Sequence, residues 1–193
     1  MPYQEKNFNN LIGVHGLSDN LLNNHLTLYQ GYVTNFNKLN DTLVNLERDD
    51  KFASPEYAEL NRRFGWEFNG MRLHELYFAN MTKSPVALDC VSGLAKAIDK
   101  EFGSYNNFEK DFKSMCAMRG IGWIILYYDK AEERFFNVWI NEYDAGHFTG
   151  CVPLLVMDVF EHAYILDYSI KKAGYIDAFI KVIDWSVISN RFE

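Results

Sequence analysis

Apolar and aromatic residues recur at alternating steps of three and four after Ser18, a spacing that predicts an amphipathic helix with one buried face. Either Ser18 or Asp19 can cap the start of this helix. Its predicted inward positions are Leu22, His25, Tyr29, Tyr32, Phe36, Leu39 and Leu43. The polar stretch from Glu47 to Pro55 indicates a turn, and a second helix carrying His74 is expected from about Glu56 to Met81. The two helices are predicted to form an antiparallel hairpin.

The pattern changes in the second half of the chain. Two shorter helices are expected near Cys90 to Phe102 and Asn107 to Met118. Three strand-length runs of β-branched and aromatic residues follow at 122–128, 135–140 and 152–157, and the first two flank a loop that is typical of an antiparallel hairpin. From about Phe160 the pattern is helical again, in two pieces with a predicted break at Ala173-Gly174.

This order of elements predicts an α+β fold. An N-terminal antiparallel helical hairpin, residues 1–83, precedes a mixed domain, residues 84–193, in which helices pack on a three-stranded antiparallel sheet. A chain of 193 residues with 48% hydrophobic content is large and apolar enough to bury a core. We therefore expect a globular protein.

Charge and composition exclude several classes of partner. A net charge of −7 argues against nucleic acid or an anionic membrane as the main partner, because both require concentrated Lys and Arg. No apolar run approaches the roughly 20 residues needed to span a bilayer. The N-terminus lacks the pattern of a secretory signal, so a cytoplasmic location is expected. Cys90, Cys116 and Cys151 are odd in number and widely spaced, which predicts buried free thiols.

Three histidines and one aspartate form a candidate metal site. His25 and His74 can meet across the hairpin, while Asp158 and His162 are four residues apart and can face one centre. Imidazole and carboxylate ligands suit iron, manganese or zinc, and the absence of thiolate disfavours a structural zinc site. Alone, His25 is more typical of a core histidine. The combination of four residues favours a metal site between the two domains.

One stretch of the chain resembles a known family. Residues 153–164, PLLVMDVFEHAY, are similar to the D-V-W-E-H-A-Y signature of the iron/manganese superoxide dismutases, with Phe160 in place of tryptophan. Further matches follow in the family's order and cover nearly the whole chain: Gln30 to Asn35, Phe102 to Ser104, Gly120 to Trp123, Gly174-Tyr175 and Asp184-Trp185.

This resemblance implies a function and a set of roles. His25, His74, Asp158 and His162 would bind one iron or manganese ion per subunit. Tyr32 would stand beside the substrate channel, and Trp123 would line the pocket. The protein would convert superoxide to dioxygen and hydrogen peroxide by one-electron redox cycling. The family resemblance also implies a homodimer or a dimer of dimers, with Glu161 and His162 near the interface.

Besides Phe160, the chain departs from the family pattern at two further places near the metal. The family's glutamine beside the metal-bound solvent is absent: the helix position is Gly70, and we expect His147, from the loop before the third strand, to fill that space. His25 and Tyr32 are seven residues apart, where the family usually has eight, and this spacing is compatible with a regular helix. The altered residues around the metal, among them His147, Phe160 and Ile165, keep open an alternative function: a metal-binding homologue with little or no activity, acting as an interaction or metal-sequestering protein.

Overall fold

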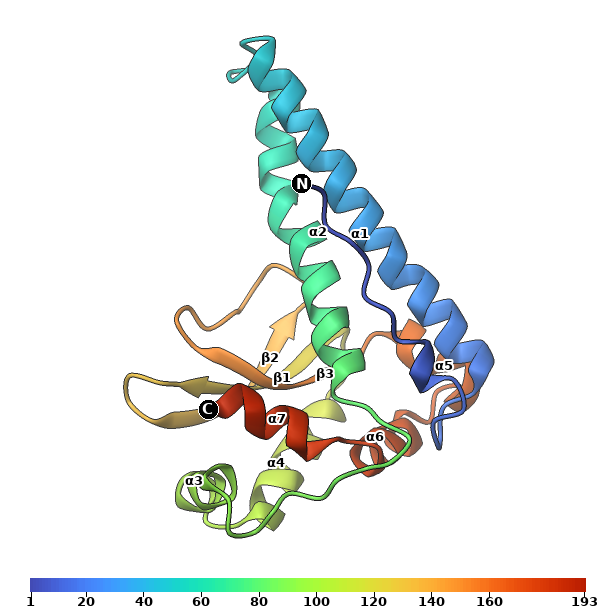
Figure 1. Ribbon diagram of the computed structural model, residues 1–193, viewed down its shortest axis with the longest axis vertical. Coiled ribbons are helices and arrows are strands. Elements are labelled where there is room, and N and C mark those ends of the chain that lie inside the picture. The colour runs from blue at the N-terminus through green and yellow to red at the C-terminus, as the bar shows by residue number, and fades with distance from the viewer.

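A long helical hairpin forms the N-terminal part of the protein. The computed structural model describes all 193 residues and places α1, Asp19–Arg48, antiparallel to α2, Pro55–Ala79 (Figure 1). Ser18 and Ser54 cap the two helices, because each side chain accepts a hydrogen bond from the backbone N–H three residues further on, both at 3.1 Å. Pro55 occupies the first turn of α2, where its missing N–H has no cost. The predicted hairpin is confirmed.

The inward face of α1 follows the predicted positions, with one informative exception. Six of the seven positions are buried, whereas Tyr32 is partly exposed. The helix is α-helical without interruption between His25 and Tyr32. Seven residues are nearly two turns, so both side chains share one face. The prediction that α1 is a regular helix between His25 and Tyr32 is therefore confirmed. Tyr32 lies at the edge of the buried face of α1, where its side chain is partly exposed to solvent.

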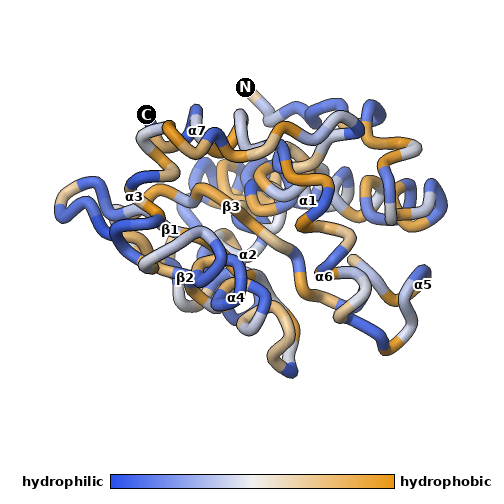
Figure 2. Tube along the Cα trace, turned by 90° about the horizontal axis from the view of Figure 1, so that it is seen from below, coloured by the Kyte–Doolittle hydropathy of each residue, from blue (hydrophilic) through white to orange (hydrophobic).

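The three strands form one antiparallel sheet in the order β2-β1-β3. Their bounds are Gly122–Asp129 for β1, Arg134–Asn141 for β2 and Val152–Asp158 for β3. The central strand β1 is fully buried from Trp123 to Leu126. Helices α2 and α7 contact β3, and helix α4 contacts β1 and β2. Strands that helices cover in this way need apolar side chains, and Figure 2 shows hydrophobic residues along β1 and β3. The predicted α+β class is confirmed.

The remaining helices surround this sheet. They are α3, Gly93–Phe102; α4, Tyr105–Cys116; α5, Ile165–Tyr168; α6, Lys172–Lys181; and α7, Trp185–Phe192, with single 3-10 turns η1, Asn9–Leu11, and η2, Glu161–Ala163. The predicted division at residue 83 falls in the link between α2 and α3. Buried residues on both sides of that link belong to one hydrophobic cluster. None of the helices is long and apolar enough to cross a membrane.

The predicted break at Ala173-Gly174 is wrong. Helix α6 runs through both residues, and the chain turns earlier, at Ser169, whose φ is +51°. Gly174 is needed for space: a Cβ at this position would lie 2.9 Å from the ring of Tyr168. The glycine therefore permits a close helix contact, and does not end a helix.

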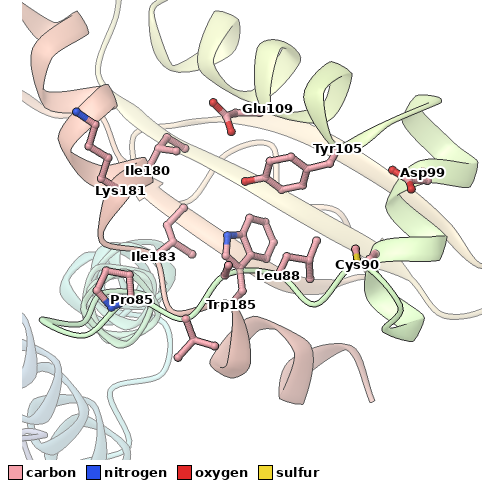
Figure 3. A pocket seen from close by; sticks show the side chains of 13 residues that line it. Pro85, Leu88, Cys90, Asp99, Tyr105, Glu109, Ile180, Lys181, Ile183 and Trp185 are labelled. Atoms are coloured by element: carbon pink, nitrogen blue, oxygen red, sulfur yellow. The ribbon is translucent and has the colours of Figure 1, made fainter.

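An apolar pocket of about 580 Å³ lies at the other end of the molecule from the hairpin tip (Figure 3). Tyr105, Ile183 and Trp185 line it, and none of the candidate metal ligands does. Cys90 also lines this pocket and is exposed, Cys151 is half-buried and Cys116 is buried. The prediction of buried thiols is thus wrong for Cys90, because the segment before α3 runs over the surface.

Candidate metal centre

Four side chains from four separate elements meet between the hairpin and the sheet. His25 comes from α1, His74 from α2, Asp158 from the end of β3 and His162 from η2. One ligand atom from each lies within 4.8 Å of all the others. The Asp158 Oδ2 atom is 3.0 Å from His162 Nε2 and 3.2 Å from His25 Nε2. The structure thus brings together all four residues predicted as ligands.

The sheet register and a tight turn place the two C-terminal members. Asp158 pairs with Trp123 across β1 and β3. Its Oδ1 atom accepts a hydrogen bond from the backbone N–H of Phe160 at 2.8 Å, so the carboxylate turns the chain directly after the strand. His162 follows in the 3-10 turn η2, which returns its ring toward Asp158. The four-residue spacing therefore works through a turn, where a longer helix was expected.

The hydrogen bond made by His74 fixes the direction of its lone pair. His74 Nδ1 lies 2.6 Å from the carbonyl oxygen of Gly70. Because a carbonyl can only accept, Nδ1 carries the proton and Nε2 presents its lone pair to the centre. The Nε2 atoms of His25 and His74 are both buried and have no hydrogen-bond partner. A metal ion would satisfy these two orphaned nitrogens, so the residues present fit a bound ion.

Burial sets the charge of this group. Burial lowers the pKa of His74 to about 3 and also lowers the pKa of His25. Burial alone would raise the pKa of Asp158, but the neighbouring imidazoles, His162 first and then His25, lower it below its usual range. At neutral pH the two buried imidazoles are neutral and the carboxylate is ionised. These are the protonation states that bind a divalent or trivalent metal.

Tyr32 and Trp123 both lie beside His74. The Tyr32 ring stacks on the His74 ring with centroids 5.3 Å apart, and the Trp123 ring meets it edge-on at 5.1 Å. Trp123 is fully buried, and its indole N–H has no hydrogen-bond partner. One wall of the site is therefore closed and apolar, while the half-buried Tyr32 reaches toward solvent.

Comparisons with known proteins agree with this geometry. Residues 91–191 match the model of the family described as iron/manganese superoxide dismutases, C-terminal domain. The chain is 33% identical over 183 residues to a protein named as an iron superoxide dismutase from Aquifex pyrophilus, covering 92% of this chain and 85% of the relative. The chain belongs to the iron/manganese superoxide dismutase family. The resemblance found in the sequence, and the enzyme class that it implies, are confirmed.

Other members of the superoxide dismutase family are similar to the same degree. A manganese superoxide dismutase of Haloferax volcanii is 34% identical over 170 residues, covering 88% of this chain and 83% of the relative. An iron superoxide dismutase of Cupriavidus metallidurans is 34% identical over 182 residues, covering 92% of this chain and 89% of the relative. Relatives named for either metal therefore match almost equally well.

His147 does not fill the space beside Gly70. A Cβ added at Gly70 would lie 2.3 Å from the Tyr32 ring, so this ring occupies the space that the family gives to glutamine. His147 Nδ1 lies 2.8 Å from the hydroxyl of Tyr127, and its Nε2 lies 2.8 Å from the carbonyl oxygen of Tyr143. Both ring nitrogens are occupied, one by β1 and the other by the loop backbone, and neither is available to a metal-bound solvent molecule.

Tyr143 is the residue that the sequence interpretation missed. Its side chain is 2% exposed although it belongs to a loop. The ring lies 5.1 Å from that of Tyr32 and 4.9 Å from that of Phe160. Burial raises the pKa of Tyr143 far above its usual range, and the negative charge of Asp158 adds to the rise. The sequence feature that could have indicated its burial is that Tyr143 is the one aromatic ring, apart from His147, in the otherwise polar stretch Asn141 to His147.

Proposed function

We propose that this protein is a superoxide dismutase, which converts two superoxide ions and two protons into one molecule of dioxygen and one of hydrogen peroxide. The observation that supports the proposal most directly is the pair of buried, partnerless imidazole nitrogens of His25 and His74 facing the ionised Asp158. With His162 they would hold one iron or manganese ion. The bound ion would supply the one-electron redox chemistry by alternating between two oxidation states.

The surrounding side chains would serve this reaction by excluding water and moving protons. Trp123 and Phe160 place apolar rings against the ligand histidines, at 5.1 Å from His74 and 5.1 Å from His162 respectively. Burial raises the pKa of Tyr32, so its hydroxyl stays protonated at neutral pH. Since Tyr32 is half-buried, it can accept a proton from solvent as it donates one toward the site.

The metal is proposed to be iron or manganese, without a choice between them. Relatives named for each metal match the chain equally well, and the ligand set suits both. We also propose a cytoplasmic location, as expected from the sequence. Membership of the family alone establishes neither the identity of the metal nor the location of the protein.

We propose a homodimer or a dimer of dimers, with Glu161 and His162 near the interface. Glu161 is exposed, and the side chain of His162 is 29% exposed although it faces the metal centre. Ile165, Leu166 and Ile170 are exposed just beyond them. A second subunit over this surface would cover these apolar side chains and shield His162.

The second candidate function is a metal-binding protein with little dismutase activity. The observation in its favour is that neither a glutamine nor a ring nitrogen of His147 points to the centre. Because hydrogen bonds around a metal site tune its reduction potential, their replacement can slow turnover without weakening binding. This candidate function would use the same four metal ligands as the dismutase, but the protein would turn over superoxide much more slowly.

One experiment separates the two functions. The purified protein is stripped of metal, reloaded separately with iron and with manganese, and assayed for superoxide dismutation at equal metal occupancy. Activity of either form well above that of the free metal supports the dismutase and identifies its metal. Full occupancy by both metals without such activity supports the metal-binding protein instead.

A further inference from the structure

The loop from Asn141 to Ala145 directs one aromatic side chain toward the metal centre. The loop is closed by a hydrogen bond from Asn141 N–H to the carbonyl oxygen of Ala145 at 3.1 Å. Glu142 has a φ of +54°, a conformation that costs free energy in any residue except glycine. The next residue, Tyr143, is thereby turned inward and buried.

Tyr143 joins two stacks of rings that cover the ligand histidines. Tyr32 stacks on His74, and Phe160 stacks on His162 with an interplanar angle of 18°. The ring of Tyr143 lies between them, 5.1 Å from Tyr32 and stacked on Phe160 at 20°. The hydroxyls of Tyr143 and Tyr32 are close enough for each to influence the pKa of the other. Tyr143 therefore places a buried ring between the two rings that cover the ligand histidines, with its own ring stacked 6.4 Å from that of His74 and its hydroxyl near that of Tyr32.

Two hydrogen bonds hold the backbone of Tyr143. Its carbonyl oxygen accepts one bond from Asn69 Nδ2 and another from His147 Nε2, both at 2.8 Å. Since a carbonyl oxygen has two lone pairs, both are used. The Nε2 atom of His147 must carry its proton, so Nδ1 accepts from the hydroxyl of Tyr127. These contacts connect the loop to α2 through Asn69 and to β1 through Tyr127.

The contact through α2 couples the loop to a metal ligand. Asn69 holds the Tyr143 carbonyl, and the adjacent Gly70 accepts the hydrogen bond from His74 Nδ1 at 2.6 Å. Consecutive residues of one helical turn thus orient both the loop and the ligand. Tyr143 can move relative to His74 only if this turn of α2 deforms, or if the Asn69–Tyr143 or the Gly70–His74 hydrogen bond breaks.

We propose that Tyr143 supplies a hydroxyl that closes this side of the metal centre, and that His147 and Asn69 are positioning residues that act through the backbone of Tyr143. Its catalytic meaning rests on the proposed dismutase function. The role assigned to His147 differs from the one expected from the sequence, because this imidazole orients another side chain and does not itself reach the centre. A hydroxyl in this place would tune the reduction potential of a bound ion.

The test compares Tyr143→Phe, which keeps the ring and removes the hydroxyl, with wild-type protein fully loaded with iron or with manganese. Metal content is expected to be unchanged, since all four ligands remain. At a fixed potential near the wild-type midpoint, the ratio of oxidised to reduced metal is expected to change at least tenfold, which corresponds to about 59 mV for a one-electron couple. The absorption spectrum of the oxidised form should change with it.

The positioning role of His147 is tested by combining variants. His147→Leu should move the midpoint potential in the same direction as Tyr143→Phe, and the double variant should move it no further than Tyr143→Phe alone. His147→Gln, which retains a donor for the Tyr143 carbonyl, should restore most of the wild-type value. His15→Leu, at an exposed histidine in the N-terminal segment, is the matched control and should change nothing. Should His147→Leu not fold, Asn69→Ala removes the other hydrogen bond to the same carbonyl.

Two results would overturn the proposal: a wild-type potential and spectrum in Tyr143→Phe, or a His147→Leu effect that persists in full when Tyr143 is phenylalanine. The potential and the spectrum do not depend on turnover. A loaded protein that shifts as expected yet does not dismutate superoxide would therefore contradict the proposed function alone. An active wild-type enzyme with an unshifted Tyr143→Phe variant would contradict this inference alone.

Discussion

The ring of Tyr32 lies against the backbone of Gly70, so that a Cβ at position 70 would be 2.3 Å from Tyr32 Cδ1. A glycine inside a helix costs about 1 kcal/mol relative to alanine. In α2 that cost is offset by the stacking of Tyr32 on His74, which needs the space. One glycine thus determines which side chain covers a metal ligand.

Gly70→Ala is expected to be destabilising despite its better helix propensity. Any side chain at this position must displace the Tyr32 ring, and overpacking of this kind typically costs about 1 to 3 kcal/mol. Urea unfolding of the metal-free protein measures the change. Gly31→Ala in α1 is the matched control, because nothing lies within 4 Å of its added Cβ, and it should be stabilising by about 0.5 to 1 kcal/mol. Equal stabilisation by both substitutions would contradict the packing argument.

Asp158→Asn is expected to abolish tight metal binding. The substitution removes the only negative charge among the four ligands, while His25, His74 and His162 remain. Metal content after reloading and dialysis should fall at least tenfold, as measured by elemental analysis. Asp41→Asn, on the exposed face of α1, is the matched control and should load normally. Normal loading of Asp158→Asn would contradict the need for a negatively charged ligand at this centre.

The stability of the metal-free protein should fall as the pH is lowered from about 6.5 to 5. Burial holds the pKa of His74 at about 3 in the folded state, against about 6.5 for an unfolded chain. Between these values the unfolded state binds one more proton, so the free energy of unfolding decreases with falling pH, by up to about 1.4 kcal/mol per pH unit for each such histidine. His25 adds to the effect in the same direction.

Urea titrations at several pH values measure this slope. His74→Gln should reduce it by about one proton, because the substituted side chain does not titrate. Metal binding should flatten the curve, since the ion and the proton compete for the same nitrogens. A metal-free protein whose unfolding free energy is constant from pH 6.5 to pH 5 would contradict the assignment of neutral, buried imidazoles.

Local patterns in the sequence predicted the hairpin, the sheet and the four ligands. Ser18 caps α1 as expected. Asp158 and His162 meet as expected from their four-residue spacing, although the turn after β3, and not a longer helix, brings them together. These features depend on neighbours close in the chain or on repeated periodicity. A single sequence carries enough information to identify them.

The surroundings of the metal centre could not be predicted in the same way. The orientation of Tyr143 depends on Asn69, 74 residues earlier, and the role of His147 depends on Tyr127. Gly174 likewise has its meaning only beside the ring of Tyr168. Long-range contacts decide each case, and a polar loop with one histidine gives no local signal of which side chain turns inward.

Tyr175→Phe is expected to weaken the fold more than the metal site. The Tyr175 hydroxyl is buried and donates to the backbone carbonyl of Asp158 at 2.8 Å, while the Tyr77 hydroxyl lies 3.0 Å away. Its removal leaves both buried groups without a partner, which costs about 1 to 3 kcal/mol per group. Metal affinity should fall less than tenfold, because all four ligand side chains remain.

Adding Tyr77→Phe to this variant should cost less than the sum of the two single substitutions, because the Tyr77 hydroxyl that Tyr175→Phe leaves unsatisfied is then also removed. Urea unfolding of the two single variants and the double variant gives the coupling. Tyr57→Phe, where an exposed hydroxyl bonds Glu47, serves as the control and should change stability by less than about 0.5 kcal/mol. Strict additivity of Tyr77→Phe and Tyr175→Phe would show that the two hydroxyls do not act as a pair behind Asp158.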